Sequence, residues 1–321
     1  MFLVVAFGSF VYVSAQVNSY ARFTISSLGI SSDQIFRIAA APTSGLVGHW
    51  KFDEGTGTTA SDSSGTGNPG TLNGPTWTTA GKIGNALTFD GVNDYVDLGN
   101  PASLQITGSM TISAWIYSTG NPPNNDDAAI VSRRGGSPAV GYQLDTTIDI
   151  GPRTIGFKLT SSSGANMIRY GTTALATNTW YHLTGIYDAS AQTMNVYLNG
   201  QLDNGSLLGT ITTAQQNSSF NTNIGRRAGN PQAYEFNGRI DDARIYNRGL
   251  SASEVLDVFN DLGGTPSPPD TTPPSVSLTA PAAGSTVSGT INVSATAADN
   301  VGVVGVQFKL DGSNLGAEDT A

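Results

Sequence analysis

Short alternating segments dominate residues 45–262, and this pattern restricts the fold more than any other feature of the 321-residue chain. In residues 110–117 the apolar side chains of Ile112, Ala114 and Ile116 recur at every second position. A period of two places successive side chains on opposite faces of a β-strand, whereas a helix needs a period of 3.6. Gly, Asn, Asp and Ser separate the segments, so we predict an all-β domain of many short strands.

Other segments of this region carry the same signal. Residues 180–188 and 193–198 are predicted strands, and Asn199-Gly200 after the second one is a strong hairpin signal. Residues 89–91 and 95–98 are interpreted as another hairpin-like pair.

One helix is predicted at the end of the region. Ser251 and Glu254 have the spacing of a capping box, and Leu250 and Val255 that of a hydrophobic staple. Gly263-Gly264 is expected to end the helix. A short helix after many strands is typical of a β-domain with one helix packed on its surface.

The flanking segments differ from this region. Residues 1–15 are interpreted as a secretory signal, although no basic residue precedes the apolar run, or else as a hydrophobic N-terminal strand. Residues 16–44 have no assignable pattern. Residues 263–274 form a Pro-rich linker that should be extended. Residues 275–321 return to strand patterns, but they supply only about half of the roughly seven strands of an immunoglobulin-like sandwich, so a truncated domain is expected.

Composition narrows the function. Charged residues make up 12% of the chain and the net charge is −9, whereas nucleic-acid binding requires a basic face. The chain has no cysteine, which excludes a disulfide scaffold and a cysteine-type zinc site. The apolar run at the N-terminus is too short to span a bilayer as a helix. We expect no nucleic-acid partner, no transmembrane span and an extracellular or cell-surface location.

Several motifs in order resemble the laminin-G-like jellyroll family, part of the concanavalin A-like lectin/glucanase superfamily. They are Gly45-Leu-Val-Gly-His-Trp-Lys-Phe-Asp-Glu54, Asp62-Ser-Ser-Gly65, Gly84-Asn-Ala-Leu-Thr-Phe-Asp-Gly-Val-Asn-Asp-Tyr-Val96 and Ile240-Asp-Asp-Ala-Arg-Ile-Tyr-Asn-Arg-Gly-Leu-Ser251. The tail, with Pro273-Pro-Ser-Val and Ala298-Asp-Asn-Val-Gly302, resembles bacterial immunoglobulin-like repeats.

The resemblance implies an all-β chain: a two-sheet jelly-roll sandwich over residues 45–262 with one short C-terminal helix, then a partial immunoglobulin-like β-sandwich. It also implies that the first and last strands of the jelly roll, residues 47–52 and 240–246, are neighbours.

A structural calcium ion is the first candidate site. Ca²⁺ takes about six to eight oxygen ligands, and related jelly rolls often hold their ends together with such an ion. The resemblance therefore implies Asp62, Asn68 and one of Asp241 and Asp242 as ligands. Adjacent residues of a strand point to opposite faces, so only one of the two aspartates should face the ion. The alternative is a loop stabilised by its own Asx turns and a solvated carboxylate.

Asn93, Asp94 and Trp77 are the candidate ligand-binding residues. Pentraxins of the same superfamily hold calcium with an Asp-Asn pair near the position of Asn93-Asp94, but their later acidic loop is replaced here by Arg226-Arg227. A turn that satisfies its own backbone is therefore the favoured alternative. Trp77 lies in a turn-rich segment and could stack on a sugar.

The other aromatic and basic residues have commoner structural roles. Trp50, Trp115 and Trp180 alternate with apolar residues and are expected in the core, although Trp115 and Trp180 could stack on sugars, as could Tyr142 and Tyr170. The doublet Arg133-Arg134 could meet acidic sugars, although a solvated loop is more usual.

Catalysis is not expected. Glycosidases of this superfamily use two carboxylates about 5–5.5 Å or 6.5–9.5 Å apart, and no closely alternating acids occur. Asp145 and Asp149 come nearest, and they are interpreted as bordering a turn. His49 and His182 stand isolated in strands.

The leading hypothesis is a non-catalytic extracellular binding or adhesion module for a glycan or a protein, with a structural calcium ion. One alternative is an accessory domain of a larger secreted carbohydrate-active enzyme. Another is a structural subunit of a cell-surface fibre that self-associates through the N-terminal apolar segment.

Overall fold

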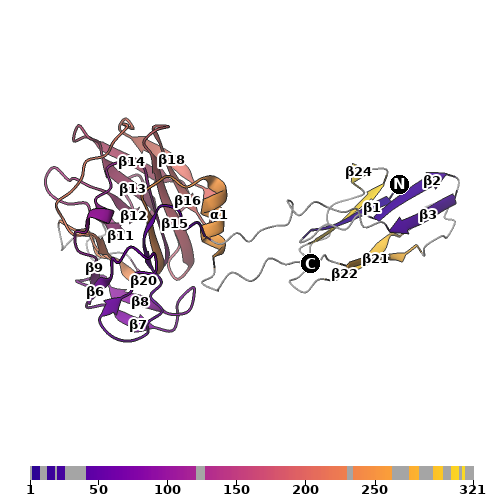
Figure 1. Ribbon diagram of the computed structural model, residues 1–321, viewed down its shortest axis with the longest axis horizontal. Helices are drawn as coiled ribbons and strands as arrows, with labels where there is room; N and C mark the ends of the chain where they lie inside the picture. The colour runs from indigo at the N-terminus through magenta and orange to yellow at the C-terminus, as the bar shows by residue number, and fades with distance from the viewer. Residues whose placement is uncertain are drawn as a thin grey trace. The chain divides into compact units, whose positions relative to one another are not determined.

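The computed structural model describes residues 2–7, 13–18, 20–25, 41–120, 127–229, 234–261, 275–281, 292–298, 305–310 and 313–314. The chain forms two compact units (Figure 1), one of them Ala39–Gly264 and the other Met1–Ile38 together with Thr265–Ala321. The first contains the predicted jelly roll. The predicted linker, residues 263–274, lies outside the described residues.

The larger unit is a sandwich of two antiparallel sheets (Figure 1). Sheet 1 has the strand order β17 (Gln201–Leu202), β16 (Thr193–Leu198), β15 (Trp180–Asp188), β10 (Met110–Ser118), β20 (Asn237–Tyr246), β8 (Ala86–Asp90) and β7 (Thr76–Thr78), with β4 (Leu46–Trp50) also paired to β20. Sheet 2 has the order β18 (Asn204–Leu208), β14 (Asn166–Gly171), β13 (Thr154–Thr160), β12 (Gln143–Thr147), β11 (Ala128–Ser132), β19 (Asn223–Ile224), β9 (Tyr95–Asp97), β6 (Gly70–Asn73) and β5 (Thr59–Ala60). The all-β jelly-roll prediction is confirmed.

The hydrophobic core lies between the sheets. Ile112 and Ile116 of β10 point inward from sheet 1, and Leu144 and Phe157 point inward from sheet 2. Each is at most 1% exposed, and burying such a side chain contributes about 1.5–3 kcal/mol. The period of two that predicted these strands is therefore the pattern that fills the core.

The first and last strands of the jelly roll are neighbours, as expected. Strand β4 pairs with β20, and Trp50 lies opposite Ala243. Trp50 is fully buried, and its indole Nε1 donates to the carbonyl of Asn68 at 2.8 Å.

Helix α1 (Ala252–Asn260) begins with the predicted capping box, in which Ser251 and Glu254 each accept from the other's backbone N–H. Leu250 and Val255 pack in one buried cluster beneath the helix, which lies beside sheet 1 (Figure 1). The hairpin predicted at Asn199-Gly200 joins β16 to β17. Both of its residues have positive φ, as a tight two-residue turn requires.

The predicted hairpin over residues 89–98 is wrong. Strand β8 belongs to sheet 1 and β9 to sheet 2, so the connection crosses the sandwich. The Asp90 carboxylate accepts from the N–H groups of Val92 and Asn93, and Asp94 accepts from the N–H of Asp90. The turn residues are thus present, but Phe89 and Val96 enter the core from opposite sheets.

The smaller unit contains the predicted immunoglobulin-like segment. Its strands are β1 (Phe2–Phe7), β23 (Gly305–Leu310) and β24 (Ser313–Asn314) in one sheet, β2 (Val13–Asn18) with β3 (Tyr20–Ile25), and β21 (Ser275–Ala280) with β22 (Ser294–Ala298). The apolar N-terminal segment therefore contributes a strand, β1, which pairs antiparallel with β23. Within the described residues, no helix has the length and apolar character needed to span a membrane.

Candidate functional site

The outer face of sheet 2 carries polar side chains that are nevertheless buried. On β12, Gln143 and Asp145 alternate with the core residue Leu144, so they point away from the core. Gln143 pairs with Lys158 of β13, and Asp145 pairs with Gly156. All three polar side chains belong to residues at most 5% exposed. A polar sheet face this deeply covered needs partners for every group.

Lys158 lies at the centre of this face. Its Nζ is 2.5 Å from Asp127 Oδ2, 2.8 Å from Asp149 Oδ2 and 3.4 Å from Asp145 Oδ2. Tyr170 Oη donates to Asp149 Oδ2 at 3.1 Å. We call these five residues the Lys158 cluster. Burial alone would lower the pKa of the Lys158 ammonium, but Asp145 and Asp127 raise it above its usual value. One fixed cation thus faces three carboxyl groups.

Asp145 is an incompletely bonded member of the Lys158 cluster. Gln143 Nε2 donates to its Oδ2 at 2.6 Å, whereas its buried Oδ1 has no hydrogen-bond partner. Burial raises the pKa of Asp145 to about 7 against the opposing effect of Lys158. A Cβ at Gly156 would lie 2.1 Å from Oδ1, so only glycine leaves room for this carboxyl group.

Arg134 extends the polar face toward β14. Its Nη1 donates to Thr160 Oγ1 at 2.9 Å and its Nη2 to Asn166 Oδ1 at 2.5 Å. Burial and the nearby Arg227 lower the pKa of Arg134 to about 10. The interpretation of Arg133-Arg134 as a solvated loop is wrong, because the two residues are 1% and 4% exposed.

The predicted calcium loop is closed by its own hydrogen bonds. The Asp62 carboxylate accepts from the N–H groups of His49, Ser64 and Asn68 at 2.8–3.0 Å, and from the hydroxyls of Ser64 and Thr66 at 2.9 and 3.0 Å. Although burial opposes ionisation, these donors hold the pKa of Asp62 below its usual value. Asp62 and Asn68 therefore lie together, as expected for one site.

Asp241 and Asp242 point to the same face of sheet 1, so the predicted alternation is wrong at this position. A β-bulge shifts the β10–β20 register between Ser113 and Trp115, and Asp242 has a φ of +48°. Aspartate tolerates this left-handed conformation better than most residues. The extra residue of a bulge interrupts the period of two, which brings both carboxylates to the outer face.

The two aspartates have separate partners there. Asp241 Oδ2 accepts from the N–H groups of Lys82 and Ile83 at 2.7 and 2.8 Å, and burial raises its pKa to about 7. Asp242 Oδ1 lies 2.6 Å from His49 Nε2, and its Oδ2 lies 2.9 Å from Arg244 Nη2.

Arg244 links Asp242 to the helix, because its Nη2 donates to Asp261 Oδ2 at 2.7 Å. Asp261 is the C-cap residue of α1. We call His49, Asp242, Arg244 and Asp261 the Asp242 network. Although burial opposes ionisation, Arg244 and His49 hold the pKa of Asp242 below its usual value. The network joins the first strand, the last strand and the terminal helix through ion pairs.

The predicted calcium ligands, which are Asp62, Asn68 and one of Asp241 and Asp242, already have protein partners. Asp62 accepts five hydrogen bonds, Asp241 is bonded to a different loop, and Asp242 contacts Arg244 and His49. Among the residues that the structure describes, no group of three or more His, Cys, Asp or Glu has the geometry to hold a metal. A narrower site, with Asp62, Asn68 and loop carbonyls, stays a prediction.

The predicted ligand residues lie in two places. Asp94 is buried in the turn, and a Cβ at Gly74 would meet its Oδ1 at 1.9 Å, while Asn93 is exposed. Trp77 is half-buried against the core, and its Nε1 donates to the carbonyl of Gly57 at 2.8 Å. Among the described residues, Trp77 makes no hydrogen bond or ring contact with Asn93 or Asp94. Their role in binding stays a prediction.

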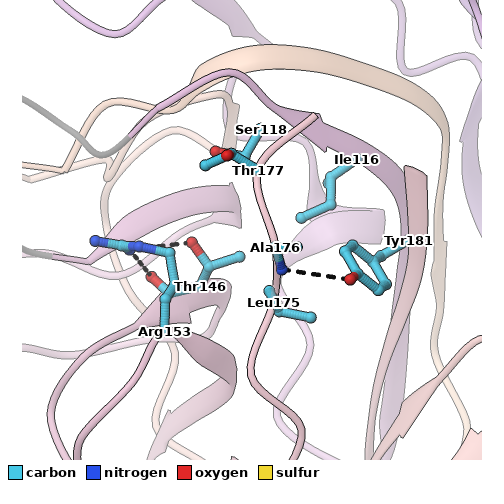
Figure 2. Close-up of a pocket in the computed structure, with 8 residues that line it drawn as sticks. All are labelled: Ile116, Ser118, Thr146, Arg153, Leu175, Ala176, Thr177 and Tyr181. Carbon is cyan, nitrogen blue, oxygen red and sulfur yellow. Dashed lines mark hydrogen bonds between the residues drawn. The ribbon is translucent and has the colours of Figure 1, made fainter. Parts of the chain in front are cut away.

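A small pocket opens between the two sheets (Figure 2). Ile116, Tyr181 and Leu175 line its apolar side, and Thr146 and Arg153 line its polar side. Its volume of about 40 Å³ suits a few water molecules rather than a sugar ring. The pocket lies on the core side of β12, opposite the Lys158 cluster.

The family model of the concanavalin A-like lectin/glucanases superfamily matches residues 90–256. The chain belongs to this superfamily. A bacterial Ig domain model matches residues 274–321, which confirms the resemblance of the tail. Comparison with curated protein sequences gave no match.

Solved structures with the same fold include a Trypanosoma rangeli sialidase complex, with TM-score 0.52, 18% identity, 75% of this chain covered and 36% of the sialidase. The binding domain of Paraclostridial Mosquitocidal Protein 1 has TM-score 0.50 and 16% identity over 67% of this chain and 52% of its own. The Botulinum Neurotoxin serotype G binding domain has the same TM-score and identity over 67% and 50%. The chain spans about half or less of the length of these structures, and the likeness shows the fold.

Sequence reasoning missed the Lys158 cluster. Asp145 lies within strand β12, and Asp149 lies in the turn after it, so the interpretation that both border a turn holds only for Asp149. The sequence signal for the cluster was that polar residues alternate with apolar residues in 143–147 and 158–160. That alternation indicates a polar sheet face but does not show which residues of different strands meet.

Proposed function

We propose that this chain is an extracellular glycan-binding module that holds sugar hydroxyls on the outer face of sheet 2. The observation that carries the proposal is the Lys158 cluster, in which three carboxyl groups share one ammonium and the Asp149 side chain is 37% exposed. Asp149 is the member that a sugar hydroxyl can reach from solvent, and its carboxylate accepts from hydroxyl groups. Membership of the concanavalin A-like superfamily supports the same conclusion as an analogy of fold.

The chemistry of the Lys158 cluster suits a polyol. Carboxylates accept from hydroxyl groups, and the Tyr170 oxygen, whose hydrogen goes to Asp149, can accept from them as well. Asp149 connects the cluster to solvent, since its side chain is 37% exposed. A glycan end that reaches Asp149 can replace the solvent that contacts this side chain.

The position of Lys158 favours binding over hydrolysis. Glycosidases hold a sugar or a water molecule between two carboxyl groups. Here the Lys158 ammonium contacts both Asp127 and Asp145 and occupies the space between them. We therefore propose a non-catalytic module, which can act alone or as an accessory domain of a larger carbohydrate-active enzyme.

A glycan array probed with the full chain, with and without EDTA, tests the proposal. We expect binding to a defined set of glycans, and we expect Asp149→Ala to weaken it by about tenfold or more, as for a lost polar contact. Asp188→Asn is the control, because Asp188 is the last residue of β15 on the other sheet. An array without signal in both buffers, or equal binding by Asp149→Ala, contradicts the proposal.

Calcium and self-association are separate proposals. The calcium proposal narrows to the Asp62 loop, where an ion has to displace donors that already bond the carboxylate. The fibre proposal requires the apolar segment of β1 to pair with another copy, and in this structure β1 pairs with β23 of its own chain. Strand exchange between copies would conserve that pairing.

A further inference from the structure

The outer face of sheet 1 carries an aromatic row that the core interpretation of the tryptophans did not anticipate. Tyr117 of β10 pairs with Arg239 of β20 on one side and with Trp180 of β15 on the other. The neighbouring residues Ile116 and Ile240 point into the core, so these three side chains point outward. We call Arg239, Tyr117 and Trp180 the aromatic row.

The members of the row contact one another. The ring centroids of Tyr117 and Trp180 are 5.5 Å apart and the ring planes are tilted by 53°, which is a favourable aromatic contact. The Arg239 guanidinium lies 4.6 Å from the centroid of Tyr117, which is a cation–π arrangement. All three residues are half-buried, so each keeps part of its surface in contact with solvent.

The adjacent row on the same face is covered, and the contrast shows that the aromatic row is open. Trp115 and His182 are 3% and 0% exposed, because Phe259 of α1 packs over both rings and Lys82 lies over Trp115. Among the described residues, the aromatic side chain of α1 makes no ring contact with Tyr117 or Trp180. The helix therefore covers one row of the sheet and leaves the next one exposed.

The polar atoms along the aromatic row are little used by the protein. Arg239 Nη1 donates to the carbonyl of Ala80 at 3.2 Å, and among the described residues this arginine forms no ion pair. Within the same part of the chain, Tyr117 Oη and Trp180 Nε1 form no hydrogen bond, and neither atom is buried. These groups face solvent beside a cation that no described residue neutralises, in a chain of net charge −9.

We propose that the aromatic row is a second glycan-binding site, which recognises a uronic acid residue of an acidic polysaccharide. A pyranose ring has an apolar face of C–H groups that stacks on the Trp180 indole, with Tyr117 beside it. In a uronic acid the carboxylate leaves the ring edge close to the plane of the ring. A ring stacked on the row therefore directs its carboxylate along the row to Arg239, whose planar fork matches a carboxylate.

The two parts of the aromatic row have different tasks. An exposed ion pair contributes little to affinity and is weakened by salt, so the rings supply the affinity. Arg239 supplies the preference for an acidic sugar over a neutral one. The site lies on the opposite sheet from the Lys158 cluster, so the two sites are independent.

Titration of the full chain with trigalacturonate and with its neutral methyl ester, followed by calorimetry, tests the proposal. We expect the acid to bind about tenfold more tightly than the ester at low salt, and this preference to shrink as salt is added. Arg239→Gln should bind both ligands equally. Trp180→Ala should lose about tenfold or more for both, as expected for a central stacking residue.

Two variants serve as controls. Ser206→Ala, at an exposed position of β18 in sheet 2, should bind trigalacturonate as the wild type does. Trp180→Phe should keep most of the affinity, which shows that a ring is what the site needs. Retained binding by Trp180→Ala, a preference that survives in Arg239→Gln, or no wild-type binding at about 10 mM ligand would each overturn the proposal. Tighter binding of sialyllactose, whose carboxylate leaves the ring axially, would overturn the choice of a uronic acid.

Discussion

The Lys158 cluster and the Asp242 network are both buried sets of charges on outer sheet faces, but they differ in how completely the protein neutralises them. In the Asp242 network each carboxylate contacts a cation, and Arg244 bridges two carboxylates. In the Lys158 cluster three carboxyl groups share one ammonium, and Asp145 keeps an unbonded oxygen.

The difference separates a structural role from a binding role. The paired network joins β4, β20 and α1, so it holds the ends of the jelly roll and needs nothing from outside. The Lys158 cluster holds an ionisable group whose pKa is strongly shifted and whose hydrogen bonding is incomplete, which is typical of binding sites. The comparison predicts that removing a charge destabilises the first set, whereas removing a carboxylate charge from the second set stabilises the protein.

The largest effect is expected from Arg244→Met. It leaves Asp242 buried with only His49 as a partner, and breaking a buried ion pair from one side costs about 3–5 kcal/mol. Urea unfolding followed by tryptophan fluorescence measures the change. Arg239→Met on the same strand is the control. It should cost less than about 1 kcal/mol, because the Arg239 guanidinium forms no ion pair with any described residue. Equal losses of unfolding free energy in the two variants would show that the Asp242 network has no structural role.

Lys158→Met should cost less, about 2 kcal/mol at pH 7. The three carboxyl groups it leaves behind can take up protons, and Asp149 reaches solvent. The loss should therefore become smaller as the pH falls from about 7 to 5, which unfolding curves at several pH values would show. A loss independent of pH would mean that packing of the lysine chain, and not its charge, stabilises the cluster.

Asp145→Asn should stabilise the protein at neutral pH. The folded-state pKa of Asp145, about 7, lies above the usual value of 3.8 for this carboxyl group. Its contribution to stability is therefore fully present below about pH 4 and is lost as the pH rises through about 7. Asparagine does not ionise, so the variant should gain about 1 kcal/mol or more on the wild type between pH 4 and 8. Asp188→Asn should show no such gain, and a gain of equal size there would refute the assignment to Asp145.

Calcium gives the smallest expected effect. In its narrowed form the calcium proposal predicts a rise of about 2–4 °C in melting temperature at saturating calcium. Asp62→Asn should abolish this rise, whereas Asp241→Asn should leave it. A rise that survives in Asp62→Asn would place the ion elsewhere, and no rise in the wild type would remove calcium from the Asp62 loop.

The fold was largely predictable from local patterns. Strands β15 and β16 occupy the predicted residues 180–188 and 193–198, and α1 begins at the predicted cap. Each of these signals depends on residues within a few positions of one another. The crossing between β8 and β9 was not predictable in the same way, because a tight turn and a sheet-to-sheet connection use the same turn residues.

The candidate sites were less predictable. Asp127, Asp145, Asp149 and Lys158 meet only because the register of β11, β12 and β13 brings them together. The aromatic row likewise depends on the pairing of β20, β10 and β15. Trp115 and Trp180 have similar sequence surroundings, yet one lies beneath α1 and the other is half-exposed.

The sequence by itself determined the strands, the caps and the family of the fold, because a period of two and a capping box act over a few residues. Tertiary structure decided which charges are paired and which are left for a ligand. The bulge at Asp242 turned two adjacent carboxylates to one face, and strand register gathered three others around Lys158. Register and bulges are set by contacts between distant segments, so no local pattern of residues specifies them.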